Sequence, residues 1–156
     1  MQLYILRHAD ADTEAASDAA RTLSEKGEEQ ARKVAQFCRS QGIQPAVIFA
    51  SPLVRAQQTA RPVARELKVA LTTANWLACG ARAEVILGEL AALGDVPAVM
   101  LVGHEPDCGH LIAHLIGAQG GSIHVRKASL ALVEVLLPRK GGGRLEFSIP
   151  VRMMSV

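Results

Sequence analysis

The amino-acid sequence predicts a single α/β domain, a three-layer sandwich in which helices flank a mostly parallel sheet. Three observations predict this fold class. Short runs of branched apolar residues alternate with stretches whose apolar residues recur at helical spacing. The 156 residues suit one domain with a substantial core, so residues 1–156 are expected to form a single domain. Hydrophobic residues make up 49% of the chain but aromatic residues only 3%, so aliphatic side chains must build that core.

The strands of the sheet are predicted from the apolar runs. Three runs are bounded by chain breakers and are typical of buried strands: residues 2–6, 46–50 and 97–102. A short extended piece is expected at residues 69–72. Residues 129–136 and 145–149 alternate between two faces, and a proline and three glycines separate them. This pattern predicts an antiparallel pair with its second strand at the edge of the sheet.

Helical spacing of apolar residues predicts helices between these strands. Ser24 is placed to cap the first helix, which is expected to run to about residue 41 and to stop at Gly42. Ser51 and Pro52 are placed to cap and open the next helix. Two more helices are expected, over residues 83–93 and from Pro106 to residue 116.

Composition excludes several classes of function. The net charge of +2 and the lack of a Lys/Arg run argue against a nucleic-acid partner. No apolar run approaches the roughly 20 residues that a membrane helix needs, and the N-terminal segment lacks the pattern of a signal peptide. The three cysteines, Cys38, Cys79 and Cys108, lack metal-ligand spacing and predict reduced thiols in a cytoplasmic protein without a metal.

Two histidines follow predicted strands and carry most of the chemical information. Arg7-His8 follows the first apolar run, and His104 follows the run at residues 97–102 after a single glycine. The carboxyl ends of strands in an open α/β sheet form the crevice where ligands bind. If the two strands are parallel neighbours, both histidines face one pocket with Arg7 beside them. A guanidinium and two imidazoles in one crevice suit a phosphoryl group.

A third segment adds a cation to this crevice. Arg55 follows the apolar run at residues 46–50 and falls near the start of the next predicted helix. A helix N-terminus already favours anions, and an arginine at that position reinforces the preference. The sequence therefore predicts an anion site bounded by Arg7 and Arg55.

The combination of these motifs resembles the histidine phosphatase superfamily, which includes phosphoglycerate mutases and acid phosphatases. The short chain is most similar to the SixA-type phosphohistidine phosphatases, over roughly residues 2–137. The resemblance implies a phosphoglycerate mutase-like fold and a phosphatase that needs neither a metal nor another cofactor. The motifs that carry it are Arg7-His8, Ser51-Pro52-x-x-Arg55-Ala-x-x-Thr59-Ala60 and Gly103-His104.

The resemblance also implies roles for single residues. His8 becomes the nucleophile that forms a transient phosphohistidine, and a neutral imidazole is available for this near pH 7. Arg7 and Arg55 clamp the phosphoryl oxygens, and His104 adds a donor from the opposite side. Arg21 is a further candidate phosphate ligand, because the resemblance places such an arginine in the first long loop and Arg21 is the only one there.

The general acid is left unassigned. Larger relatives supply a carboxylic acid after the third strand, but residues 75–82 contain no carboxylate. Glu105, directly after the second histidine, and Asp18, in the first long loop, are the two alternatives. Ala9 also departs from the Arg-His-Gly pattern of many relatives. His110 and His114 share one helix face but lack the intervening glutamate of a metal motif, so packing or surface roles are expected for them.

A weak or absent acid favours a phosphohistidine substrate, because a protonated imidazole leaves far more readily than an alkoxide. The chain is too short for large capping insertions, which favours a phosphorylated side chain on another protein. We therefore expect a phosphatase that releases phosphate from a signalling or phosphotransfer protein. The alternatives are a small-molecule phosphate ester phosphatase of the same mechanism and a catalytically weak phosphoprotein-binding module.

Overall fold

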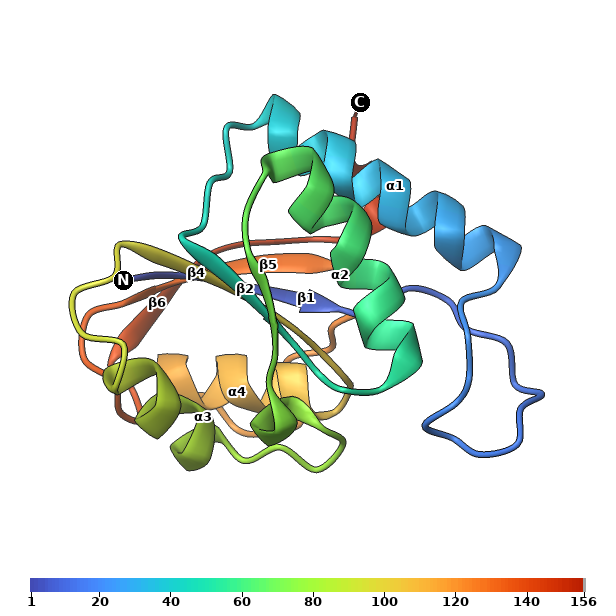
Figure 1. Cartoon of the computed structure of the whole chain (residues 1–156). Coiled ribbons are helices and arrows are strands. Elements are labelled where there is room, and N and C mark those ends of the chain that lie inside the picture. Colours follow the sequence, from blue (N-terminus) through green and yellow to red (C-terminus); the bar gives the residue numbers. More distant parts are fainter. Residues whose placement is uncertain (156) are drawn as a thin grey trace.

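A six-stranded sheet forms the middle layer of the protein (Figure 1). The computed structural model describes residues 1–155. The strand order is β3-β2-β4-β1-β5-β6, with β1 to β4 parallel, β5 antiparallel to β1 and β6 antiparallel to β5. The predicted α/β fold is confirmed. The strands are β1 Gln2–Arg7, β2 Val47–Ala50, β3 Leu71–Thr73, β4 Ala98–Gly103, β5 Leu130–Val135 and β6 Gly143–Ile149.

Helices cover both faces of the sheet. α1 (Glu25–Ser40) and α2 (Val54–Leu67) cover one face, and α3 (Ala83–Ala91) and α4 (Asp107–Ile116) cover the other (Figure 1). Two short 3₁₀ helices, η1 (Asn75–Leu77) and η2 (Val151–Met153), complete the chain. None of the helices in residues 1–155 is long and apolar enough to cross a membrane.

The central strand β4 explains why both faces must be covered. Every residue of β4 is buried, as expected for a parallel strand between two helical layers. Met100 and Val102 pack in the cluster beneath α1 and α2, whereas Val99 and Leu101 pack in the cluster beneath α3 and α4. The two clusters place β4 and its neighbour β1 between the two halves of the core.

The helix starts confirm one predicted cap and correct another. Ser24 caps α1 by accepting a hydrogen bond from the Gly27 N–H at 3.0 Å. The prediction that Ser51 caps α2 and that Pro52 opens it is wrong, because α2 begins at Val54 after an uncapped Leu53. The chain makes a turn first, in which the Ser51 hydroxyl accepts from the Leu53 N–H at 3.2 Å. α4 likewise begins one residue after Pro106.

The register of the parallel strands brings three loop starts to one edge of the sheet. Arg7 of β1 pairs with Gly103 of β4, and Ala50 of β2 pairs with Val102 of β4. β1 and β4 are therefore parallel neighbours, as the convergence of the two histidines requires. The residues that follow these strand ends are His8, Ser51 and His104.

Candidate active site

The two histidines form the floor of a site at the carboxyl edge of the sheet. The ring centroids of His8 and His104 lie 5.3 Å apart, and the rings are tilted by 54°. Both side chains are buried, with exposed fractions of 6% and 3%. The predicted convergence of the two imidazoles is therefore present in the structure.

The hydrogen bonds of His8 define which ring nitrogen is free. Nδ1 lies 2.7 Å from the Ala9 carbonyl oxygen. A carbonyl oxygen can only accept, so Nδ1 carries the proton and Nε2 keeps its lone pair. Burial lowers the pKa of His8 to about 3, and the positive charges of Arg55 and Arg7 act in the same direction. The contact with Ala9 and the burial of the ring therefore favour a neutral imidazole that keeps a lone pair on Nε2.

Arg55 is the cation nearest to that nitrogen. Its Nε–H donates to His8 Nε2 at 3.4 Å, and its side chain is almost fully buried. The other guanidinium nitrogens donate to the Asp18 carbonyl oxygen at 2.8 Å and to its carboxylate at 3.1 Å. The Cys79 sulfur lies 3.6 Å from the NH2 atom of Arg55. α2 thus places a guanidinium group beside the Nε2 atom of His8.

Arg7 approaches the site from the end of β1. Its NH1 donates to the Val125 carbonyl oxygen at 3.0 Å. Its Nε is buried and has no hydrogen-bond partner among residues 1–155. Burial lowers the pKa of Arg7, the negative charge of Glu105 opposes this shift, and the charge of Arg55 adds to it. Two guanidinium groups at one site are suited to binding an anion such as a phosphoryl group.

His104 is hydrogen-bonded to Ser51, which the sequence predicts to be a helix cap. Its Nε2 lies 2.7 Å from the Ser51 hydroxyl, while its buried Nδ1 has no hydrogen-bond partner within the described residues. Burial lowers the pKa of His104 to about 4, and the charges of Arg55 and Arg7 reinforce this direction. Ser51 follows β2 at the same sheet edge as the histidines, and that position was the signal in the sequence.

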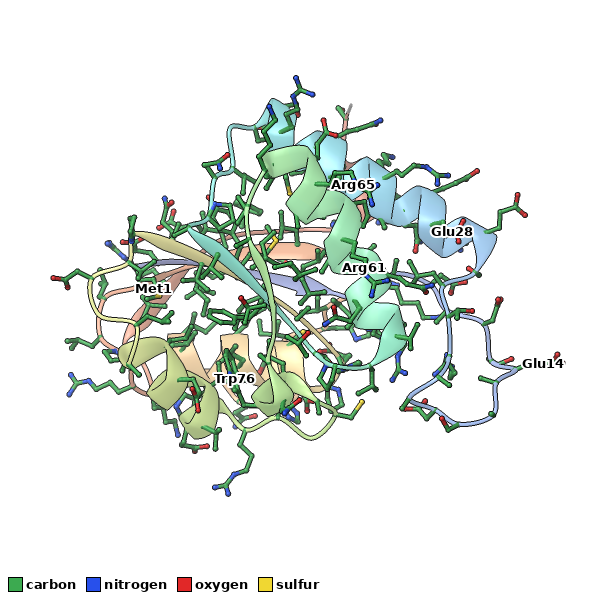
Figure 2. All side chains as sticks on the ribbon, viewed as in Figure 1. Met1, Glu14, Glu28, Arg61, Arg65 and Trp76 are labelled. Atoms are coloured by element: carbon green, nitrogen blue, oxygen red, sulfur yellow. The ribbon has the colours of Figure 1, made fainter. Side chains whose placement is uncertain are left out.

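Arg21 lies at the rim, in the loop between β1 and α1. Its Nε donates to the Asp12 carbonyl oxygen at 2.8 Å, and its NH1 donates to the Asp18 carboxylate at 3.2 Å. Asp18 therefore bridges Arg21 and Arg55. Arg21 is connected to the floor of the site through this carboxylate and makes no direct hydrogen bond to His8 or His104 within the described residues. Figure 2 shows Glu14 at the tip of the same loop, pointing away from the body of the protein.

The Glu105 carboxylate links two backbone segments through hydrogen bonds. One carboxylate oxygen accepts from the Gly109 N–H and the other from the Val125 N–H, both at 2.7 Å. The backbone of Val125 is therefore bound at both its polar groups, because its N–H donates to Glu105 and its carbonyl oxygen accepts from Arg7. Glu105 thus fixes the acceptor that orients Arg7, and its oxygens are already occupied by backbone donors.

The contacts of Asp18 favour its ionised form. Its carboxylate is 62% exposed and accepts hydrogen bonds from Arg21 and Arg55. Those hydrogen bonds hold the pKa of Asp18 below its ordinary value. A carboxylate kept ionised by two guanidinium groups is a poor proton donor near neutral pH.

Of the remaining histidines and cysteines, Cys79 lies beside Arg55, and His124 Nδ1 lies 3.8 Å from Glu105 Oε2. His110 and His114 lie on α4, with His110 exposed and His114 half-buried. Burial raises the pKa of the Cys108 thiol and raises that of Cys38 to about 12, so both stay protonated. Among residues 1–155, no group of three or more His, Cys, Asp or Glu side chains is placed to hold a metal ion.

The fold and the arrangement of these residues suit an α/β enzyme of phosphoryl transfer. A neutral buried imidazole presents a nitrogen lone pair beside a guanidinium, at the sheet edge where such folds bind ligands. A second imidazole and a second guanidinium flank the same position.

Comparison with known proteins identifies the family. The model of the histidine phosphatase superfamily (branch 1) matches residues 3–78. The phosphohistidine phosphatase SixA of Escherichia coli (strain K12) is 29% identical over 154 residues, which cover 96% of this chain and 93% of that protein. The phosphohistidine phosphatase SixA homolog of Haemophilus influenzae (strain ATCC 51907 / DSM 11121 / KW20 / Rd) is 32% identical over 129 residues. The match covers 75% of this chain and 78% of that protein.

A solved structure agrees with these relatives. The structure of the protein histidine phosphatase SixA complexed with tungstate superposes with a TM-score of 0.88 at 26% identity, covering 99% of this chain and 100% of that one. The chain belongs to the histidine phosphatase superfamily, in its SixA-type branch, and is an enzyme of the phosphatase class.

Proposed function

We propose that the protein removes phosphate from phosphohistidine carried by another protein, with His8 as the nucleophile. The observation that carries the mechanism is the orientation of His8, whose Nδ1 proton is directed at Ala9 while Nε2 faces Arg55. The lone pair of Nε2 attacks phosphorus, and the bond between phosphorus and the substrate imidazole breaks. The second nitrogen of the substrate ring first takes a proton from solvent, so the departing nitrogen keeps the bonding electrons and the ring leaves as neutral imidazole.

Water completes the cycle. It attacks the phosphorus of phospho-His8, the P–N bond breaks, and the electrons return to Nε2 as inorganic phosphate departs. Arg7 and Arg55 donate to the non-bridging oxygens during both steps, and His104 donates from the opposite side. Such preorganised donors stabilise the charge that develops in phosphoryl transfer.

The P–N substrate class is supported by the state of the two carboxyl groups near the site. Glu105 is engaged by two backbone N–H groups, and Asp18 is ionised between two arginines. An ester substrate needs a proton donor for its alkoxide leaving group, whereas an imidazole leaves readily once its ring is protonated. The SixA relatives are phosphohistidine phosphatases by name, which supports the same substrate class.

The test compares two peptides of identical sequence, one bearing phosphohistidine and the other phosphoserine. The phosphohistidine peptide should be preferred in kcat/KM by about 10² to 10⁴, the usual rate contribution of a general acid. Equal or better turnover of phosphoserine would reject the substrate class while leaving the His8 mechanism standing. Stoichiometric binding without phosphate release would instead identify a phosphoprotein-binding module.

A chelator provides a separate control on cofactor use. The proposed mechanism assigns every charge-stabilising role to side chains, so turnover should persist in excess EDTA. Loss of activity that a divalent cation restores would contradict the proposal.

A further inference from the structure

A basic groove opens beside Arg7, outside the catalytic floor. It encloses about 400 Å³ and is lined by five cationic side chains: Arg7, Lys26, Arg126, Lys127 and Arg152. Its position follows from the topology. β5 runs antiparallel to β1, so the segment that precedes β5 lies at the carboxyl end of β1. β6 is antiparallel to β5, so the segment that follows β6 lies there too.

The charges of this groove are largely uncompensated. Asp10 is the one carboxylate among its lining residues, and it already accepts from Lys127 at 2.9 Å and from the Ser24 hydroxyl at 2.6 Å. Lys26, Arg126 and Arg152 are exposed and form no ion pair within residues 1–155. The whole chain carries a net charge of only +2, so this concentration of cations is local.

The loop between β1 and α1 is acidic. It carries Asp10, Asp12, Glu14 and Asp18 against a single arginine, and of these four acids only Asp10 lines the groove. Glu14 projects from the tip of the loop (Figure 2). A long polyanion such as a nucleic acid would be repelled where it passed this loop, whereas a protein with one acidic patch can place that patch in the groove alone.

We propose that the basic groove docks an acidic surface of the phosphoprotein substrate, next to its phosphohistidine. The inference rests on the proposed function for the identity of the phosphorylated residue. Arg7 joins the two regions, because it lines the groove and also lies beside His8. Exposed cations act over several ångströms of solvent, so the groove raises the rate of productive encounter more than it alters the chemical step.

The experiment uses two phosphohistidine peptides of equal length, with glutamates flanking the phosphohistidine in one and glutamines in the other. Wild-type protein should prefer the glutamate peptide in kcat/KM by about tenfold at low ionic strength, at the lower end of electrostatic steering effects. The preference should shrink as salt is added, because screening shortens the range of the charges.

Reversing charges in the groove tests whether its cations cause the preference for the glutamate peptide. Lys26→Glu combined with Arg126→Glu should bring the ratio of the two peptides to about one or below. The matched control is Arg139→Glu with Lys140→Glu, which makes the same change of charge in the exposed turn between β5 and β6, at the opposite edge of the sheet. This control should keep the wild-type ratio. All four positions are exposed, so folding should be preserved.

The outcomes separate this inference from the proposed function. Failure to hydrolyse either phosphohistidine peptide would reject the proposed function. Binding of stable phosphoserine peptides with the two flanks to His8→Ala protein would then still measure the groove. Equal affinity or turnover for the glutamate-flanked and glutamine-flanked peptides would overturn the docking proposal. An equal loss of the glutamate preference in the control variant would overturn it too. So would an oligonucleotide that competes better than the glutamate peptide.

Discussion

The floor and the rim of the site are built on opposite physical principles. The floor consists of His8, His104 and Ser51, which are buried, uncharged and joined to their surroundings by short hydrogen bonds. The rim consists of Asp18 and Arg21, which are more exposed and joined by an ion pair. Arg55 spans the two regions, with its Nε at His8 and its other nitrogens at Asp18.

The contrast separates two tasks of a phosphatase. Desolvation on the floor keeps the imidazoles neutral, which a nitrogen nucleophile requires. At the rim, the Asp18 carboxylate accepts hydrogen bonds from Arg21 and Arg55. It therefore occupies donors that could otherwise bind the oxygens of a phosphoryl group. The floor should therefore determine kcat, while the rim should adjust the affinity for phosphate.

The largest effect should come from His8→Ala. Without the nucleophile, turnover should fall by about four orders of magnitude or more, as in other enzymes that lose a covalent catalyst. The acid-labile, base-stable phosphoenzyme should also disappear. The measurement is phosphate release together with radiolabel retention on the protein. A folded His8→Ala variant with normal turnover would falsify the mechanism.

Arg55→Ala should cause the next largest loss, because it removes the donor that faces His8 Nε2. We expect kcat to fall about 10² to 10³-fold, the range for losing one transition-state donor. Arg61→Ala, which changes an exposed arginine further along the same helix, is the matched control (Figure 2). If both variants lost activity equally, general destabilisation of α2 would explain the result better than phosphate binding.

The neutral floor also predicts how stability depends on pH. The folded pKa values of His8 and His104, about 3 and about 4, lie below the ordinary value of 6.5. Below pH 6.5 the unfolded chain therefore binds more protons, and stability that is complete above this pH is lost as the pH falls. Two such histidines together should lower stability by about 2 kcal/mol between pH 6.5 and 5.5, and more steeply below that until the folded pKa values are reached.

Urea unfolding at pH 6.5 and 5.5 measures this dependence. His104→Asn should lose about half of it, since one of the two buried imidazoles is gone. An identical pH dependence in wild-type and variant protein would show that His104 is not held neutral by burial.

The floor could be predicted from the sequence because strand ends define it. Arg7-His8 and His104 follow apolar runs, and parallel pairing of β1 with β4 is sufficient to bring them together. Arg55 follows from its place at the start of a helix. Ser51 was assigned as a cap because serine before proline is typical of helix starts, and only the tertiary contact with His104 reveals its different position.

The rim could not be predicted in the same way. Residues 9–22 have no periodicity, so nothing in the sequence determines that the Asp18 carboxylate joins Arg21 to Arg55. Glu105 illustrates the same limit. Its position after His104 fits a general acid, but the backbone donors at Gly109 and Val125 come from segments whose approach depends on the folded chain.

Ser51→Ala should have an intermediate effect. It leaves His104 Nε2 without its buried partner, so the ring loses its fixed orientation. A loss of about 1 to 3 kcal/mol in stability is expected, together with about a tenfold fall in kcat at little changed KM. Ser51→Thr restores the hydroxyl and should recover most of kcat. Failure of this rescue in a folded variant would argue against a role through the hydroxyl.

The smallest effect should come from Asp18→Asn, and it distinguishes the two roles open to this residue. The carboxylate occupies Arg55 and Arg21, so its loss should lower the inhibition constant of phosphate about two- to fivefold, the strength of an exposed ion pair. Asp12→Asn removes the same charge from the same loop and serves as the control. If Asp18 were the general acid, kcat would fall about 10² to 10⁴-fold instead, most of all for phosphoserine. A tighter phosphate complex with kcat within a few-fold of wild type would assign Asp18 to the rim as a displaceable anion, and a collapse of kcat would assign it to the chemistry.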